Sequence, residues 1–317
     1  MGIPKLNKLL IERCSQKAIY KTHLENLYEK KIAVDISIYL YRFLADGNFM
    51  EHLYLFLSLF KYYCIEPIFI FDGKPPAEKY ATIKKRKLEK QAASKEYAEL
   101  ESILETAPEN KYDIEKRMDI LKTKMIRVKW EDIDKAIELI QSFGFTYYIA
   151  PHEADQLCTY LSVKNMVYAV MSDDMDMIIS GCSYVIRNFN MSTHEVFIYN
   201  NTQILHDLNI SLEHFRQIII LSGTDYDTSD KRISIRKAFD LYQQFSQYDI
   251  KPPFYEWLSS QEIDIDRDEL DMIYNLFDIT PYMDELNTFI EASSTEKKKM
   301  SVAAIKTIMK QYRFIFL

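Results

Sequence analysis

Acidic side chains recur in this sequence directly after short apolar runs. Asp35 closes the run Lys31–Asp35 (KIAVD), and Asp72 follows the run Pro67–Phe71 (PIFIF). Further acids follow an apolar run or open a helical pattern: Glu153, Asp155, Asp173, Asp174, Asp176 and Asp225. Carboxylates gathered without histidine or cysteine ligands select hard cations. The pattern therefore predicts a site for Mg²⁺ or Mn²⁺.

Each of these acids, taken alone, has an ordinary structural explanation. An aspartate after a strand commonly caps a helix or stabilises a turn, and the acids at 173–176 have the spacing of such a cap. Several carboxylates brought together repel one another unless a cation is present. Because so many acids recur in the same kind of place, we favour a metal site over a series of caps.

The apolar runs around the acids predict an α/β fold. Short β-branched runs lie at 31–35, 67–71, 145–149, 167–171 and 183–187, and helical patterns separate them at 50–65, 131–143 and 153–163. This alternation is typical of a mostly parallel central sheet flanked by helices. Ligands of such sheets gather beyond the carboxyl ends of the strands. Two further helices joined by a turn are expected at 212–221 and 235–245, followed by helical segments from 253 onward.

The segment 74–129 interrupts this alternation with a long, charged sequence of helical composition, which Pro108 divides in two. Long excursions between strands are commonly functional. Lys79 and Arg86 are spaced seven residues apart within it, about two helical turns, so both face the same way on a helix. The alternative is a solvated helix face held by ion pairs.

Net charge and cysteine usage limit the classes of function. The formal net charge of −7 argues against binding to nucleic acid, unless bound cations neutralise part of the acid. The four cysteines lie far apart without a Cys-x-x-Cys pair, which argues against zinc and for inert core thiols in a reducing, intracellular compartment. No apolar stretch approaches the ~18 residues of a membrane span, and no signal peptide is apparent.

Six segments, in order along residues 1 to about 250, form a more specific pattern. They are Met1–Leu10 (MGIPKLNKLL), Val34–Asp35 with Ser37 and Tyr41, Phe71–Pro76 (FDGKPP), Ala150–Asp155 (APHEAD), Ser172–Asp176 (SDDMD) and Leu221–Tyr226 (LSGTDY). These segments resemble motifs of the flap endonucleases and related XPG-type 5′ nucleases. The resemblance implies a PIN-like 5′-nuclease fold with a single nuclease domain over 1–317. Within it, 74–129 is the helical arch, 211–250 the helix–two-turn–helix region and 251–317 a C-terminal helical region.

The resemblance also implies the reaction. The chain is expected to be a structure-specific 5′ nuclease that hydrolyses flapped, gapped or branched DNA in replication, repair or recombination. Two Mg²⁺ ions, for which Mn²⁺ can substitute, assist the reaction. The implied ligands are Asp35, Asp72, Glu153, Asp155, Asp174, Asp176 and Asp225, whereas Asp173 stands where relatives have an acid that is not a principal ligand. Lys79 and Arg86 match the catalytic cations of the arch.

Further matches imply contacts with DNA. The contacting residues are Gly2, Tyr41, Lys84, Lys85, Lys231, Arg232, Arg236 and Lys237, with Tyr41 stacking on a base. Relatives have a Gly-hydrophobic-Gly turn at 230–236, but here Arg232 and Ser234 take the glycine places and Ile235 replaces a proline. We expect the duplex to be held by side-chain charge, with steep salt dependence and no preference for potassium over sodium.

The expected partner is DNA with a free 5′ end or a branch, bound by a monomer without contact to a membrane. The C-terminal segment Gln311–Leu317 lacks the adjacent aromatics of a sliding-clamp binding box, so we expect no clamp binding through it. The expected location is the nucleus for a cellular eukaryotic protein, or the replication site in the host cell for a viral one.

Three alternatives remain open at the level of sequence. A 5′→3′ exoribonuclease also begins similarly to MGIPK, but its acidic motifs differ from FDGKPP and HEAD, and comparing matched DNA and RNA substrates separates the two. A non-catalytic DNA-binding scaffold conflicts with the intact set of acids. The third alternative is a metal-binding structural protein, in which the basic segment 74–129 would have no function.

Overall fold

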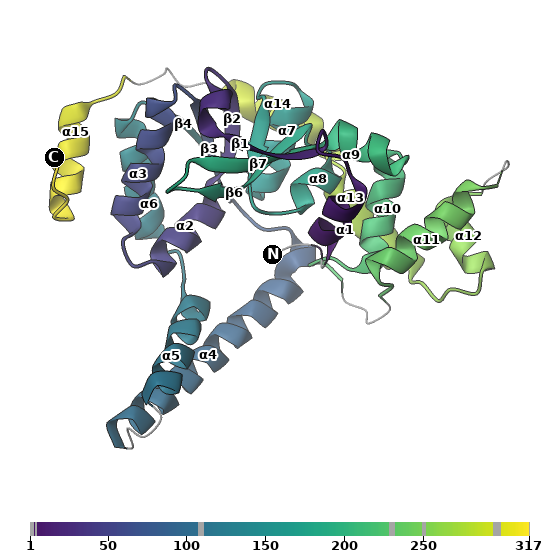
Figure 1. The fold of residues 1–317 in the computed structure, drawn as a ribbon, viewed down its shortest axis with the longest axis horizontal. Helices are drawn as coiled ribbons and strands as arrows, with labels where there is room; N and C mark the ends of the chain where they lie inside the picture. The colour runs from purple at the N-terminus through teal and green to yellow at the C-terminus, as the bar shows by residue number, and fades with distance from the viewer. Residues whose placement is uncertain are drawn as a thin grey trace. The chain divides into compact units, whose positions relative to one another are not determined.

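The computed structural model describes residues 3, 5–106, 111–227, 232–248, 252–293 and 299–316. Its centre is a seven-stranded sheet with the strand order β1-β7-β6-β5-β2-β3-β4 (Figure 1). The strands are β1 (Ile19–His23), β2 (Lys31–Asp35), β3 (Glu66–Phe71), β4 (Thr146–Ile149), β5 (Ala169–Met171), β6 (Tyr184–Asn190) and β7 (Glu195–Asn200).

Parallel pairing dominates the sheet, which confirms the predicted α/β class. The strand β2 lies between β3 and β5, with Val34 opposite Phe69 on one side and Met171 on the other. These strands are buried on both faces, as expected for continuous apolar runs covered by helices. The antiparallel strands β7 and β1 extend one edge beyond β6. Neither strand was predicted. Polar residues interrupt the apolar pattern of β1, whereas the apolar run within β7, Val196–Tyr199, was overlooked.

The chain forms two compact units of dense internal contact. The first is Met1–Ile36, Leu59–Pro75 and Thr146–Glu296, and the second is Ser37–Ser58, Pro76–Phe145 and Lys297–Leu317. All strands of the sheet belong to the first unit. This division does not test whether 1–317 is a single nuclease domain, which stays a prediction.

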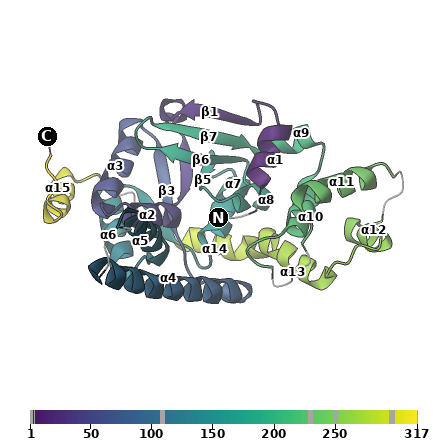
Figure 2. The same cartoon turned by 60° about the horizontal axis from the view of Figure 1, so that its bottom comes forward.

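The helices of the first unit lie around the sheet and, at α11 and α12, beyond α10 (Figure 2). They are α1 (Leu6–Arg13), α7 (Ala154–Val163), α8 (Asp176–Ser180), α9 (Asn201–Leu208), α10 (Leu212–Ser222), α11 (Ile235–Ser246), α12 (Phe254–Ser260), α13 (Arg267–Phe277) and α14 (Met283–Ala292), with short 3₁₀ turns at η1 (Leu24–Leu27) and η4 (Thr280–Tyr282). Nearly all of α7 is buried, because it packs against β2, β3 and β5. The two helices expected at 212–221 and 235–245 are α10 and α11, and they pack against each other.

The second unit is helical. It contains most of α2 (Ile36–Ala45) and α3 (Phe49–Tyr62), together with α6 (Trp130–Ser142) and α15 (Val302–Gln311). The stacked rings of Tyr39 and Phe56 lie at its core, with centroids 4.7 Å apart. The tail after α15 folds back so that Phe314 and Phe316 contact the ring of Tyr54. This agrees with the interpretation of the C-terminus as a packing segment.

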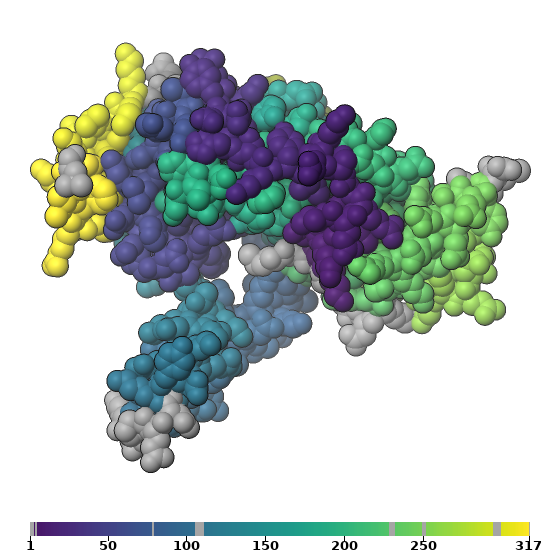
Figure 3. All heavy atoms as spheres, in the orientation of Figure 1, coloured from purple at the N-terminus to yellow at the C-terminus, as the bar shows by residue number. Residues whose placement is uncertain are grey.

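The basic segment forms a helical hairpin in the second unit. After the 3₁₀ turn η2 (Ala77–Lys79), α4 (Tyr80–Thr106) and α5 (Lys111–Met125) lie side by side (Figures 1–3). The guanidinium of Arg117 on α5 binds both carboxylate oxygens of Glu96 on α4, at 2.6 and 2.9 Å. The predicted break at Pro108 lies outside the described residues.

Across the described parts of the chain, no helix combines the length and the apolar character needed to cross a membrane.

Candidate metal centre

Four neighbouring strands deliver acids to the same edge of the sheet. In the order β5-β2-β3-β4, the strand ends lead to Asp174, Asp35, Asp72 and Glu153. These strands are mutually parallel, so their carboxyl ends meet, as in other open α/β sheets. Residues far apart in the sequence are thereby brought together.

Asp35 is the buried member of this group. Its side chain is only 7% exposed, and the Ser172 hydroxyl donates a hydrogen bond to its Oδ2 at 3.0 Å. Burial raises the pKa of the Asp35 carboxyl well above its ordinary value, and nearby carboxylates raise it further: Asp72, Asp155 and Asp174. Mutual repulsion around a buried carboxylate is the electrostatic condition that a bound cation relieves.

Gly73 explains how the loop after β3 docks against the loop after β4. Its N–H donates to the His152 carbonyl at 2.6 Å, and a Cβ on Gly73 would stand 1.8 Å from the Ala150 carbonyl oxygen. The only residue that fits is therefore glycine. The docking lets Asp72 Oδ1 accept a hydrogen bond from the Ala154 N–H at 2.9 Å. Asp72 is thus a helix cap, as the ordinary explanation expects, but it caps a distant helix, α7.

The start of α7 presents two further acids. Glu153 occupies the N-cap position without a capping hydrogen bond from its side chain. Its Oε2 instead accepts a hydrogen bond from the Tyr226 hydroxyl at 3.1 Å. Asp155 Oδ1 accepts from the Gln156 N–H at 2.7 Å. Burial raises the pKa of the Tyr226 hydroxyl, and the negative charges of Asp155, Glu153 and Asp176 raise it further. Tyr226 therefore keeps its proton and stays a hydrogen-bond donor. Sequence reasoning used Tyr226 only as part of a motif and missed this contact.

The loop after β5 is tied to Asp35 through Ser172. Its hydroxyl, which donates to Asp35, also accepts from the Asp174 N–H at 3.2 Å. Asp174 Oδ1 accepts from the N–H of Asp176, the buried first residue of α8, at 3.2 Å. The capping interpretation therefore holds in part for Asp174. It does not exclude a metal role, because a carboxylate offers a second oxygen.

Asp173 has a different environment from its neighbour Asp174. Its Oδ1 accepts from the Asn188 N–H at 2.7 Å, and its carbonyl accepts from the Arg187 guanidinium at 2.6 Å. Both partners lie on β6. These contacts tie Asp173 to β6, and its place outside the set of principal ligands stays a prediction.

The turn after α10 carries Asp225, which is half-buried. Its architecture rests on Asp227, whose oxygens accept from the Thr224 N–H and hydroxyl at 3.0 and 2.8 Å. Gly223 has a φ of +102° here, a conformation that favours glycine. The guanidinium of Arg232 lies 3.1 Å from Asp227. Arg232, expected to contact DNA, is therefore also an internal ion-pair partner.

The donor set fits a hard divalent cation in its chemistry, since every candidate ligand is a carboxylate. In the described part of the chain, no three His, Cys, Asp or Glu side chains form a ready-made ligand cluster. The interactions above connect Asp35 with Asp72, Asp155 and Asp174, and Tyr226 with Glu153. They establish a shared acidic neighbourhood, which we call the acidic centre, whereas the individual ligands stay predictions.

The predicted cations of the hairpin lie in the second unit. Lys79 ends η2 and Arg86 lies on α4, both half-buried, whereas Lys84 and Lys85 are exposed. Lys90 is a further cation on α4, to which the sequence assigned no separate role. Its ammonium donates to the Ile126 carbonyl at 2.8 Å.

Tyr41 and Lys90 meet in the same unit. The ammonium of Lys90 lies 5.2 Å from the centre of the Tyr41 ring, within the range of a cation–π contact. Burial lowers the pKa of Lys90, and the charges of Arg127 and Arg86 lower it further. The ring expected to stack on a base is thus accompanied by a group of cations.

The predicted turn at 230–236 has ordinary backbone geometry where it is described. Ser234, in a glycine place of the relatives, has φ −58° and caps α11 through its hydroxyl. Ile235 is buried, and the Arg236 guanidinium binds Glu12 on α1 at 2.7 Å. Lys237 is exposed. Gly2 and Lys231 lie outside the described residues.

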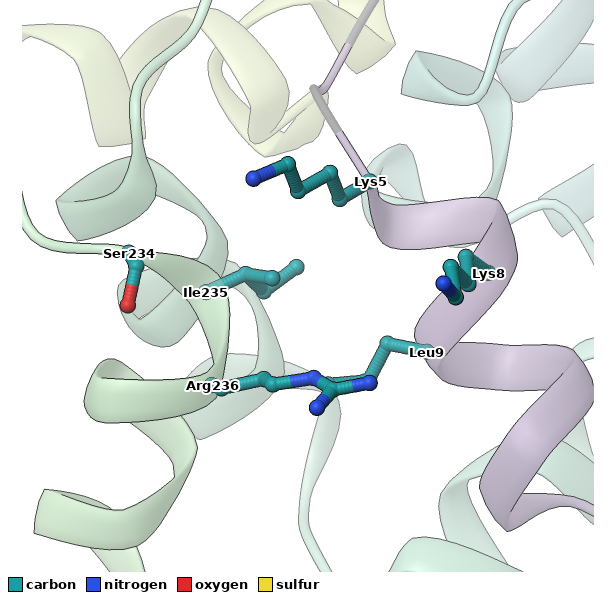
Figure 4. Close-up of a pocket in the computed structure, with 6 residues that line it drawn as sticks. All are labelled: Lys5, Lys8, Leu9, Ser234, Ile235 and Arg236. Atoms are coloured by element: carbon teal, nitrogen blue, oxygen red, sulfur yellow. The ribbon is translucent and has the colours of Figure 1, made fainter.

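A pocket of about 350 Å³ separates α1 from the start of α11 (Figure 4). Its lining is Lys5, Lys8, Leu9, Ser234, Ile235 and Arg236. The sequence did not point to Lys5 and Lys8, because their sequence neighbours form an ordinary amphipathic helix. Glu12 binds Arg236 and also lies 3.9 Å from Lys8, so an acid of the protein partly neutralises this basic pocket.

The cysteines require one correction. Cys158 and Cys182 are buried, and burial raises the pKa of both thiols, as expected for inert core residues. Cys64, however, is exposed. It lies in the turn that precedes β3, with a positive φ of 52°, and its side chain points away from the apolar core that the sequence predicted.

Comparison with known proteins finds relatives in sequence and solved structures of similar fold. Residues 1–93 match the XPG N-terminal domain and residues 144–225 the XPG I-region. Flap endonuclease 1 of Encephalitozoon cuniculi is 33% identical over 262 residues, which cover 77% of this chain and 73% of that protein. The catalytic core of Rad2 in complex with DNA substrate has a TM-score of 0.67 at 20% identity, covering 98% of this chain and 94% of that one. Flap endonuclease-1 from Methanococcus jannaschii has a TM-score of 0.56 at 20% identity, covering 94% and 96%.

Proposed function

We propose, from the premise that this chain belongs to the XPG family of structure-specific 5′ nucleases, that its acidic centre is where the phosphodiester bonds of DNA are hydrolysed. The observation that carries this proposal is the environment of Asp35. A buried carboxylate is surrounded there by the charges of Asp72, Asp155 and Asp174. Such an arrangement is costly for the fold and has a chemical use when cations bind.

The nucleases of this family are metal-dependent, and the oxygen-only donor set of this chain favours Mg²⁺, with Mn²⁺ as a substitute. The ligands we propose for two ions are Asp35, Asp72, Glu153, Asp155, Asp174, Asp176 and Asp225. When bound, such ions activate water and stabilise negative charge on the phosphate. Ser172 orients Asp35 and Asp174, and the Tyr226 hydroxyl orients Glu153.

We assign two tasks in the reaction to the hairpin together with Tyr41 on α2. Lys79 and Arg86 supply positive charge to the scissile phosphate as negative charge develops on it. Tyr41 stacks on a base, and the exposed Lys84 and Lys85 attract the backbone of the single strand. A free 5′ end would be selected by shape, because phosphate contacts carry no sequence information.

We propose that the duplex beyond the cut is bound by the side chains of Lys231, Arg232, Arg236 and Lys237. Gly2 is proposed as a further contact with the DNA. Because side-chain cations make these contacts, affinity should fall steeply with salt. The φ of −58° at Ser234 supports a backbone that does not need glycine at this place. We therefore expect matched titrations of a flap substrate in potassium and sodium chloride to superimpose. Tighter binding in potassium would contradict this account of the turn.

We propose further that the protein acts as a monomer on DNA with a free 5′ end or a branch, without a sliding clamp bound at the C-terminus. The packing of Phe314 and Phe316 on Tyr54 supports the last point, since it occupies both phenylalanine side chains of the tail. The proposed location is the nucleus, or the host replication site for a viral protein. Light scattering of the protein alone and with a clamp tests the assembly.

The function is tested by cleavage of labelled flap, gap, nick and single-stranded DNA, with matched RNA versions, in Mg²⁺ and in excess chelator. We expect cleavage of the DNA flap that leaves a 5′-phosphate and a 3′-hydroxyl and stops in chelator. Faster cleavage of RNA would favour the exoribonuclease alternative. Full activity in chelator would contradict the metal mechanism, and binding without any cleavage would favour a scaffold.

A further inference from the structure

The C-terminal helices α13 and α14 pack beside three segments that carry proposed ligands. These are the loop before α7, the turn after α10, and α8. The first contact is between α14 and the loop before α7. Glu285 Oε1 lies 3.1 Å from His152 Nε2, and the Tyr282 ring packs edge-on against the imidazole at 5.9 Å. His152 directly precedes Glu153, and its carbonyl accepts the Gly73 N–H. His152 therefore joins α14 to the loops that carry Asp72 and Glu153.

The second contact connects α13 with the same acid. The ring of Phe277, the last residue of α13, packs edge-on against Tyr226 with centroids 5.6 Å apart. The Tyr226 hydroxyl donates to Glu153 Oε2. Phe277 thus limits the positions that this hydroxyl can take, because both rings are buried.

The third contact concerns α8, the helix that begins at Asp176. The buried Arg216 on α10 donates to the Ile179 and Ser180 carbonyls at the end of α8, at 2.7 and 2.8 Å. Asp278, which follows α13, lies 3.7 Å from the same guanidinium. A buried arginine is stable only when its charge is compensated, and α13 supplies the compensating acid.

We infer that α13 and α14 hold the acidic centre in its metal-binding geometry, with His152 and Glu285 as positioning residues for Glu153. The inference rests on the proposed role of Glu153 as a ligand. It assigns a task to residues 267–292, which lie beyond the family motifs. Partners that orient metal ligands commonly alter metal affinity by about 10- to 100-fold when they are removed.

The helices α7 and α14 also share a contact, matched in kind, that involves no proposed ligand. The Tyr160 hydroxyl on α7 donates to Asn287 Oδ1 on α14 at 2.9 Å. It joins α7 to α14 in the same way as the histidine pair, but it lies further along α7 from Glu153. Losing it removes a helix–helix contact and leaves the support of the acid intact.

The test measures Mn²⁺ binding to the DNA-free full-length protein by calorimetry. We expect Glu285→Ala and His152→Ala each to raise the Kd by about 10-fold, and the double variant to be no weaker than either one. Glu285→Gln, which keeps an oxygen acceptor, should bind almost as the parent does, and Asn287→Ala should be unchanged. The imidazole and the carboxylate are partly exposed, at 35% and 52%, so the variants should fold, and their melting temperatures are compared in chelator.

The outcomes separate this inference from the proposed function. If the parent binds Mn²⁺ and Glu285→Ala binds it equally well, α14 does not position the centre. If Asn287→Ala loses as much affinity as Glu285→Ala, the helix acts by packing alone and the positioning role is wrong. If the parent itself neither binds Mn²⁺ nor cleaves DNA with it, the proposed function fails, and this inference fails with it.

Discussion

The acidic centre and the basic hairpin are held by the fold in opposite ways. Carboxylates of the acidic centre accept hydrogen bonds from groups elsewhere in the first unit, including the Ala154 N–H and the Ser172 and Tyr226 hydroxyls. In the hairpin, Lys84 and Lys85 are exposed on a helix surface. Like charges that must converge need rigid support, whereas cations that meet a mobile strand do not. The net charge of −7 is a sum that hides the opposite signs of the basic hairpin and the acidic centre.

The largest expected effect is the loss of cleavage in Asp174→Asn. The amide is a poorer ligand, and losing several kcal/mol of charge stabilisation corresponds to roughly 10³-fold in rate. DNA affinity should stay the same, because no basic group is removed. Single-turnover cleavage and binding of one flap substrate measure the two quantities.

Asp173→Asn is the matched control for that variant. Its carboxylate is engaged by the Asn188 N–H, so we expect cleavage to persist with a slight loss of stability. If Asp174→Asn stayed active, or Asp173→Asn were the inactive variant, the assignment within this pair of acids would be wrong.

On the hairpin, Lys79→Ala and Arg86→Ala should each slow single-turnover cleavage by roughly 10²-fold, the cost of losing one transition-state contact. Affinity should change much less, because these residues act on charge that develops during the reaction. Lys116→Ala, an exposed cation on α5, is the control. Loss of affinity at an unchanged rate would make Lys79 and Arg86 ordinary phosphate contacts.

The third prediction concerns stability without metal. The folded-state pKa of Asp35 is raised, so its ionised form destabilises the fold, increasingly as pH rises above the unfolded value of about 3.9. Asp35→Asn removes this cost and abolishes cleavage. We expect its melting temperature in chelator at pH 7 to exceed that of the parent by roughly 2–4 °C, the shift that 1 kcal/mol produces in a large domain.

The pH series provides the control for Asp35→Asn. The difference between variant and parent should shrink as the pH falls toward the unfolded pKa, where both side chains are neutral. A variant that melts below the parent at pH 7 would show that hydrogen bonding by the Asp35 carboxylate outweighs repulsion.

The smallest expected effect is a gain in DNA affinity for Glu12→Gln. Glu12 pairs with Arg236 and Lys8 beside the basic pocket, and surface pairs of this kind are worth about 0–1 kcal/mol. We expect a gain of up to about 5-fold at low salt that disappears at high salt. The control is Glu25→Gln, an exposed acid in the turn η1. Equal affinity for both variants would mean that this pocket does not meet DNA.

Sequence patterns predicted the parts of the molecule that depend on neighbouring residues. The strand β2 has the predicted limits 31–35, and α7 begins one residue from its predicted start, because periodicity and strand length are local properties. The motif residues at Asp35 and Asp174 were found for the same reason: each follows an apolar run.

Contacts between distant residues had no such signal. Asp72 caps α7 across 82 positions, and nothing near Asp72 in the sequence indicates which N–H it will bind. The pair of His152 and Glu285 is separated by 133 positions. Such contacts follow from the strand order and the helix packing, which one sequence without alignment does not specify.

The interleaved strand order also has a consequence for synthesis of the protein. The strand β2 lies between β3, which leaves the ribosome soon after it, and β5, which appears far later. The edge where the acids meet is therefore incomplete until the chain has been translated beyond Met171, and Tyr226 reaches Glu153 later still. Since domains fold as their chain emerges, the nascent protein is expected to be unable to cut DNA during most of its translation.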